Sequence, residues 1–243
     1  MTGSVLLLDT MPLVYRAHHL NPPALTGLAA FVDEMRAKVG ATRVVCARDT
    51  PAPSFRRELS GVYKANRRRT PQAILAQMPD LDACLAGVGA EVYRVPGFEA
   101  DDILATVARE LRERAERGLV VSCDRDMVAL AHGGIELLLL WQHRRGERRF
   151  DERTVRRRFG VHPSLFGEWL AFKGDKGDGV PGVPGLHPRD AARLVTEWGS
   201  AAGVLENLGS VRPPTLRRLI ETHAERIRAN ARVLPLRDDV PLS

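Results

Sequence analysis

This sequence of 243 residues has few cysteines and no long apolar run, and each shortage excludes a class of protein. Its three cysteines, Cys46, Cys84 and Cys123, are odd in number and widely spaced, which predicts buried free thiols rather than a disulfide scaffold or a zinc site. The longest mainly apolar run, from Ile135 to Trp141, is far shorter than the roughly 20 residues that cross a bilayer. The N-terminus lacks a basic segment before its first apolar stretch, so we expect no signal peptide, no membrane contact and a cytoplasmic location.

A glycine-rich dinucleotide motif is also missing. Asp9-Thr10-Met11-Pro12 follows the first strand-like stretch, where Gly-x-Gly-x-x-Gly would stand, and this excludes a nucleotide-dependent dehydrogenase. What the sequence does contain is an ordinary hydrophobic content of 44% and a net charge of +6. These values predict a folded protein and favour a polyanionic partner, although basicity alone is weak evidence.

The first half of the chain alternates apolar runs with helix-length stretches. Five runs predict strands: Val5–Leu8, Val44–Ala47, Glu91–Val95, Leu119–Cys123 and Ile135–Leu140. Apolar residues at three-to-four-residue spacing predict helices between them, from Leu25 to Val39 and from Ile103 to Leu111. Short apolar strands that alternate with amphipathic helices indicate an α/β fold, with a mostly parallel sheet and helices on both faces.

The second half changes character after Leu140, where we expect no further strand. The stretch from Gly174 to Pro188 holds five glycines and three prolines, and it precedes a predicted helix from Arg189 to Glu197. A second helix is predicted from Pro213 to Val233, and we expect the last ten residues to be loosely packed. The chain therefore divides into a sheet domain over residues 1–160 and a helical region over residues 161–243.

Acidic residues follow four of the predicted strands. They are Asp9, Asp49, Glu99 with Asp101 and Asp102 at the start of the next helix, and Asp124 with Asp126. The carboxyl ends of parallel strands share one edge of a sheet, which is where ligands bind in such folds. One such aspartate is explained by a helix cap or a turn. Seven together would repel one another, so we expect them to converge on bound ions, and oxygen ligands suit two or more Mg²⁺ or Mn²⁺.

Two other segments are open to two interpretations. Asp175 and Asp178 lie in a Gly-rich stretch that fits either a plain surface turn or an extension of the acidic group. Between Arg56 and Arg69 there are six basic residues and one acid, Glu58, which fits a solvated helix face or a phosphate-binding segment.

Taken in order, these motifs match a known family. The matching segments are Leu6–Asp9, Tyr15–Ala17, Phe55–Leu59, Tyr63–Arg67, Val95–Asp102, Ser122–Asp126 and Gly174–Gly185. The chain resembles the 5′ nuclease family, which includes flap endonucleases, phage 5′ exonucleases and the N-terminal domain of bacterial DNA polymerase I. The resemblance implies a PIN/Rossmann-like sheet domain, an arch at about residues 52–80, and a helix-hairpin-helix (H3TH) in the helical region.

The resemblance also implies which residues act. It places one metal beside Asp49, Glu99 and Asp101, and a second toward Asp124, Asp126 and Asp178. Asp9, Asp102 and Asp175 would act partly through bound water. Lys64 and Arg67 match the catalytic bases of the family.

The DNA contacts implied in the same way are Tyr15, Arg16, Arg56, Arg57, Arg68, Arg69, Gly182, Gly185, Arg189 and Arg193. In relatives the hairpin turn often binds a monovalent cation. Here His187-Pro188-Arg189 replaces the usual Gly, acid and Lys, which argues against that cation site. Setting aside the nine predicted ligands leaves 21 of the 30 acids against 36 Lys and Arg, an excess of 15 positive charges for DNA phosphates.

We therefore expect a monomeric 5′ nuclease, near the nucleoid if bacterial, that cuts DNA with 5′ flaps, nicks or gaps and removes RNA primers. Water would attack the phosphorus and leave a 5′ phosphate. Two alternatives stay open: a PIN-type ribonuclease, which would need neither the arch nor the hairpin, and a DNA-structure-binding relative without catalysis.

Overall fold

A computed structural model of the chain describes residues 4–20, 22–67, 69–141 and 145–242. Two compact units are present. Unit 1 comprises Met1–Ala52, Arg68–Asp151 and Arg237–Ser243, and unit 2 comprises Pro53–Arg67 and Glu152–Leu236. These units are not divided by a single boundary near residue 160. Residues 53–67 pack with the helical unit, and residues 237–243 pack with the sheet.

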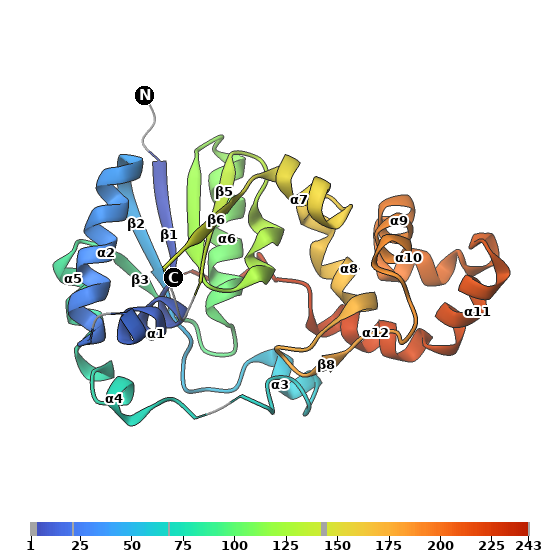
Figure 1. Cartoon of the computed structure of the whole chain (residues 1–243), viewed down its shortest axis with the longest axis horizontal. Coiled ribbons are helices and arrows are strands. Elements are labelled where there is room, and N and C mark those ends of the chain that lie inside the picture. Colours follow the sequence, from blue (N-terminus) through green and yellow to red (C-terminus); the bar gives the residue numbers. More distant parts are fainter. Residues whose placement is uncertain (1–3, 21, 68, 142–144, 243) are drawn as a thin grey trace. The chain divides into compact units, whose positions relative to one another are not determined.

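Unit 1 is built on a six-stranded sheet (Figure 1). Its strands are β1 (Ser4–Asp9), β2 (Ala41–Ala47), β3 (Glu91–Tyr93), β4 (Gly118–Ser122), β5 (Ile135–Leu140) and β6 (Glu147–Phe150). The strand order is β3-β2-β1-β4-β5-β6, and only β6 runs antiparallel to its neighbour. The five predicted strands and the mostly parallel sheet are confirmed.

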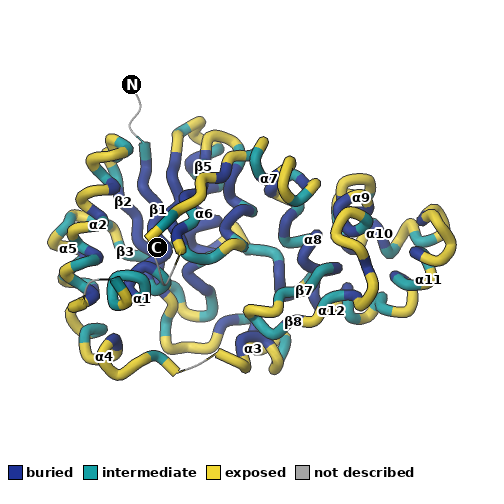
Figure 2. Tube along the Cα trace, in the orientation of Figure 1, coloured by how far each residue is buried: buried dark blue, intermediate teal, exposed yellow. Residues whose placement is uncertain are grey.

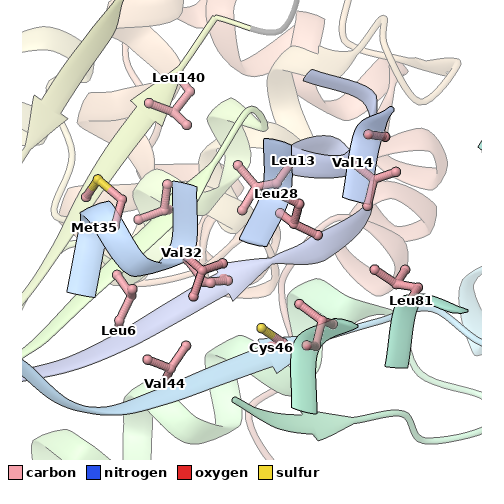
Figure 3. Packing of buried hydrophobic residues seen from close by; sticks show 14 of the residues in the cluster. Leu6, Leu13, Val14, Leu28, Val32, Met35, Val44, Cys46, Leu81 and Leu140 are labelled. Atoms are coloured by element: carbon pink, nitrogen blue, oxygen red, sulfur yellow. The ribbon is translucent and has the colours of Figure 1, made fainter. Parts of the chain in front are cut away.

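Helices cover both faces of this sheet. They are α1 (Thr10–Leu20), α2 (Ala24–Val39), α4 (Gln72–Leu75), α5 (Leu81–Gly87) and α6 (Ala100–Glu113), with short 3₁₀ helices η1 (Met78–Asp80) and η2 (Arg125–Leu130). On one face, side chains of α1, α2, α4 and α5 pack on alternate residues of the strands (Figure 3). On the other face, α6 contacts β1, β2 and β4. Alternation of side chains along each strand gives the sheet these two apolar faces, and strands β1, β2, β4 and β5 are buried over most of their length (Figure 2).

Unit 2 is mainly helical. Its elements are α3 (Phe55–Leu59), α7 (Glu152–Phe159), η3 (Pro163–Leu165), α8 (Phe166–Lys173), β7 (Gly174–Asp175), β8 (Val180–Pro181), α9 (Pro188–Trp198), α10 (Ala201–Glu206), η4 (Leu208–Ser210), α11 (Pro214–Thr222) and α12 (Ala224–Val233). Within the described residues, no helix is both long enough and apolar enough to cross a membrane.

Four local predictions are wrong. Strand β6 follows Leu140, where no strand was expected, because its sequence Glu-Arg-Arg-Phe is charged and only its pairing with β5 makes it a strand. The helix predicted over Pro213–Val233 is interrupted at His223 and forms α11 and α12. Residues near the C-terminus are packed rather than loose, since Val240 is 4% exposed. Of the three cysteines, only Cys46 is fully buried, although all three are free thiols.

Candidate active site

The predicted acids of unit 1 follow the carboxyl ends of four parallel strands. Asp9 is the last residue of β1, and Asp49 and Asp124 come shortly after β2 and β4. Glu99 ends the loop after β3 and is the N-cap of α6. Because β1 lies between β2 and β4, the strand order reverses beside β1, which is the position where open α/β sheets bind ligands.

A serine links the acids of β1 and β4. The Ser122 hydroxyl donates to Asp9 Oδ2 at 2.5 Å and accepts from the Asp124 backbone N–H at 2.8 Å. Asp9 and Ser122 are both buried, at 3% and 0% exposure. Parallel pairing of Leu8 with Val121 puts these two residues side by side at the ends of their strands. Ser122 was not among the predicted site residues, although its position as the last residue of a buried strand could have marked it.

Asp124 and Asp126 also have local partners. Asp124 is the N-cap of η2, and its Oδ1 accepts from the Asp126 backbone N–H at 2.9 Å. Asp126 forms an ion pair with Arg125 at 3.6 Å. Helix capping therefore accounts for the conformation of Asp124, and both carboxylates remain half-buried rather than sealed from solvent.

The acids around α6 form a second hydrogen-bonded group. Asp49 is exposed, and its Oδ1 accepts from the Ala100 backbone N–H at 2.8 Å. Glu99 and Asp102 form a capping box, in which Asp102 Oδ2 accepts from the Glu99 backbone N–H at 3.2 Å. Asp101 lies in the same first turn. Carboxylates are favourable at this end of a helix because its unpaired N–H groups carry partial positive charge.

The sequence predicts that these side-chain oxygens converge on bound ions. Within the described ranges, no three side chains of His, Cys, Asp or Glu lie close enough together to hold a metal ion. Asp9, Asp49, Asp102 and Asp124 accept the backbone and hydroxyl hydrogen bonds described above. Their donor set still fits hard divalent ions in kind, because it is oxygen throughout and the exposed or half-buried acids are accessible to ions.

The other two predicted ligands, Asp175 and Asp178, belong to unit 2. Asp175 ends β7, and Asp178 lies in the turn before β8. Asp175 Oδ1 accepts from the Gly177 N–H at 2.6 Å and the Asp178 N–H at 3.4 Å. The Asp178 side chain is 15% exposed and pairs with Arg67 Nη2 at 2.8 Å. The Lys64 backbone N–H donates to the Asp178 carbonyl at 2.8 Å.

Lys64 and Arg67, the two predicted catalytic bases, thus both contact Asp178, a predicted metal ligand. Lys64 has a positive φ of 54°, is 8% exposed, and its Nζ lies 5.0 Å from the centroid of the Tyr63 ring. Arg67, which forms the ion pair with Asp178, is half-exposed. The segment is not one long helix, because α3 ends at Leu59 and turns follow it.

The other basic residues of this segment differ in accessibility. Arg57 and Arg69 are exposed, as expected of DNA-binding groups, and Arg68 lies outside the described residues. Arg56 is 2% exposed, and its guanidinium donates to the carbonyls of Val233 and Pro235 at 2.8 and 3.1 Å. The prediction that Arg56 contacts DNA is therefore corrected: burial assigns it a structural role.

Tyr15 and Arg16 extend from α1 in unit 1. The Tyr15 hydroxyl donates to Thr70 Oγ1 at 2.8 Å, and the Arg16 guanidinium lies 5.8 Å from the Phe31 ring centroid. Both side chains are half-buried. They remain candidates for nucleic-acid contact.

The predicted hairpin of unit 2 has a crowded start and an open turn. A Cβ on Gly182 would lie 2.1 Å from the Lys173 carbonyl oxygen, whereas one on Gly185 would meet no atom within 4 Å. His187 is the N-cap of α9 and accepts the Arg189 N–H through Nδ1 at 3.2 Å. Arg189 is exposed, and Arg193 pairs with Glu197 at 3.4 Å.

Cys123 lies next to the linked acids. Burial raises the pKa of its thiol to about 12, and the neighbouring carboxylates of Asp9 and Asp124 add to this rise. The thiol therefore stays protonated at neutral pH and does not compete as an anionic ligand.

Comparison with known proteins finds relatives in sequence and in fold. Residues 4–160 match the family model described as the 5′-3′ exonuclease N-terminal resolvase-like domain, and residues 161–243 match the 5′-3′ exonuclease C-terminal SAM fold. Thermostable DNA polymerase I of Thermus filiformis is 34% identical over 199 residues, which cover 82% of this chain and 23% of that protein. DNA polymerase I of Mycobacterium leprae is 30% identical over 250 residues, covering 98% of this chain and 27% of that protein. The chain thus spans about a quarter of the length of these relatives.

Among solved structures, a flap endonuclease of bacteriophage T5 in a complex with DNA and metal ions aligns with a TM-score of 0.75. The alignment covers 96% of this chain and 89% of that one at 18% sequence identity. At this identity the likeness shows the fold.

Proposed function

The chain belongs to the 5′-3′ exonuclease family, and from this premise we propose that it is a structure-specific, divalent-metal-dependent 5′ nuclease acting on DNA. The observation that carries the proposal is the set of carboxylates after β1, β2, β3 and β4, at the edge where the strand order reverses. A sheet edge with this many acids suits a phosphodiesterase, since bound divalent ions offset both the carboxylates and the phosphate.

The acids of unit 1 would bind the metal ions in two groups. Asp49, Glu99 and Asp101 are the proposed ligands on the α6 side, and Asp124 and Asp126 those on the η2 side. Asp9 and Asp102 are more deeply buried, so they would act through water or by orienting neighbours. When bound, divalent ions supply charge neutralisation and lower the pKa of water. Asp175 and Asp178 stay proposed ligands by resemblance.

The basic residues would hold the DNA. We assign Lys64 and Arg67 to the scissile phosphate by resemblance to the family. Both lie beside Asp178, which Lys64 contacts through its backbone N–H and Arg67 through its side chain. Arg57, Arg69 and Arg189 are exposed and would contact phosphates without reading bases. Tyr15 would stack on an unpaired base, with Arg16 beside it in sequence. Gly182, Gly185 and Arg193 would belong to the duplex-binding hairpin.

The substrates we propose are 5′ flaps, nicks and gaps, and RNA primers on DNA, cut by a monomer in the compartment that holds the chromosome. The likeness in fold to a flap endonuclease that was solved with DNA and metal ions supports this choice. Mg²⁺ and Mn²⁺ are the proposed ions, since carboxylate oxygens suit both.

The test is a cleavage survey with end-labelled 5′-flap, nicked, gapped and RNA-primed duplexes, each with Mg²⁺ or Mn²⁺. We expect release of a 5′-terminal product from flap DNA, and loss of cleavage by a factor on the order of 10² or more in Asp124→Asn with flap binding retained. Preference for single-stranded RNA would instead indicate a PIN-type ribonuclease. Flap binding without cleavage in any metal would indicate a DNA-structure-binding protein.

A further inference from the structure

The segment Arg237–Val240, here called the return segment, makes a series of hydrogen bonds to α6 in unit 1. The Arg237 backbone N–H donates to Asp102 Oδ1 at 2.9 Å, and the Val240 backbone N–H donates to Thr106 Oγ1 at 3.1 Å. Arg109 Nε donates to the Asp238 carbonyl at 2.8 Å. Three successive turns of α6 are therefore tied to a segment more than 120 residues away in sequence.

The first of these contacts reaches the acidic start of α6. Asp102 is completely buried at 0% exposure, and its two oxygens accept from two different backbone N–H groups. Oδ2 accepts from Glu99 within the capping box, and Oδ1 accepts from Arg237. A carboxylate held by donors on both oxygens has one orientation, so the capping box and the return segment fix Asp102 together.

The side chain of Arg237 makes contacts separate from those of its backbone N–H. The guanidinium lies 5.4 Å from the Phe98 ring centroid and pairs with both oxygens of Asp239 at 2.8 and 2.6 Å. These groups are half-exposed, so the ion pair itself adds little stability. The backbone contact to the buried carboxylate is the stronger candidate for a functional role.

We infer that the return segment is a positioning element for the metal-binding acids at the start of α6, acting through the Arg237 backbone N–H. Holding Asp102 holds the turn that carries Glu99 and Asp101, whose carboxylates are the proposed ligands. Groups that orient ligands without touching a metal typically change metal affinity by about 10–100-fold. This inference rests on the proposed function, and it adds a segment that no sequence motif indicated.

The test measures Mn²⁺ affinity of the full chain by the electron paramagnetic resonance of free Mn²⁺, with no DNA present. Arg237→Pro removes the N–H donor, and we expect Mn²⁺ affinity to fall about tenfold or more. Arg237→Ala keeps the N–H and removes only the guanidinium, so its Mn²⁺ affinity should stay within about twofold of the wild type. The pair separates the backbone contact from the side chain.

A second variant covers the case in which proline prevents folding. Thr106→Val removes the acceptor of the Val240 N–H at nearly constant volume, together with the bond from the Thr106 hydroxyl to the Asp102 carbonyl at 2.9 Å. It leaves both donors to the Asp102 carboxylate in the sequence. We expect a smaller loss of Mn²⁺ affinity, about threefold to tenfold, with circular dichroism unchanged at low temperature.

If the return segment only stabilised the fold, the result would be different. The variants would then unfold at lower temperature yet bind Mn²⁺ as the wild type does at about 10 °C, and that outcome overturns the inference. Absence of Mn²⁺ binding by the wild-type chain would instead overturn the proposed function, so the two failures are distinguishable.

Discussion

Arg56 and Arg57 are adjacent residues with the same side chain and opposite environments. Arg56 is buried and donates to two carbonyls, whereas Arg57 is exposed. The sequence could not separate them, because both belong to one basic stretch and a five-residue helix shows no clear apolar face. Burial, rather than charge, decides which of them can contact a polyanion.

This difference predicts opposite phenotypes for the two arginines. Arg56→Met should lower the free energy of unfolding by about 2–5 kcal/mol, because two buried carbonyls lose their donor. Arg57→Met should change it by less than about 0.5 kcal/mol and weaken flap-DNA binding several-fold. Urea unfolding and fluorescence anisotropy measure the two effects. Equal destabilisation by both variants would contradict the placement of Arg56.

At the same scale, the acids show what the sequence can and cannot predict. Their positions after successive strands follow from apolar periodicity and the rule for parallel sheets, so the shared edge was predictable. Their partners were not, because the bonds of Ser122 to Asp9 and of Arg237 to Asp102 join residues 113 and 135 positions apart. No local pattern in the sequence marks such pairs.

At the scale of elements, the segment between β8 and α9 depends on glycines for two different reasons. A Cβ on Gly182 would meet backbone atoms, namely the Lys173 carbonyl carbon and oxygen and the Gly174 nitrogen, so the chain would have to move. Gly185 has open space around it but a positive φ of 78°, which L-residues adopt only with strain.

The two glycines should therefore respond differently to substitution. Gly182→Ala should increase hydrogen exchange across residues 172–183 and abolish tight duplex binding. Gly185→Ala should cost about 1–2 kcal/mol, and Gly185→Asn should cost less because Asn tolerates this conformation. Hydrogen-exchange mass spectrometry and duplex titration provide the readouts. If Gly182→Ala behaved as the wild type, the close approach to Lys173 would not exist in solution.

Elements of strong apolar periodicity were the most predictable. Strands β1, β2, β4 and β5 are buried and appear directly as apolar runs. Strand β6 is exposed at three of its four residues and charged, so its formation depends on a partner strand that the local sequence does not reveal. The break between α11 and α12 was missed because apolar residues continue on both sides of His223.

At the scale of the whole molecule, the excess of basic residues outside the predicted ligands predicts strongly salt-dependent DNA binding. If the protein neutralises about 6–10 phosphates, raising the salt concentration from 50 to 200 mM would lower its DNA affinity by roughly 10³–10⁵-fold. Arg189→Ala should reduce the slope of log affinity against log salt by about one. Titrations of flap DNA in a KCl series, without a cleavage-supporting metal, measure this slope.

Arg43 provides the matched control. It is held by Glu91 through two hydrogen bonds at 2.8 and 2.7 Å, and the pKa of Glu91 is lowered, first of all by this bond. Arg43→Ala should leave the salt slope unchanged, because its charge is already paired within the protein. A slope that stays constant in Arg189→Ala would remove Arg189 from the proposed DNA surface.

The return segment also sets an order of events during synthesis. Unit 1 is assembled from residues on either side of the helical unit, and its last hydrogen bonds to α6 come from Arg237 and Val240. Since a ribosome delivers the chain from the N-terminus, the sheet and α6 emerge before the segment that secures Asp102. A nascent chain would thus gain its fully ordered acidic edge only after the helical unit has been translated.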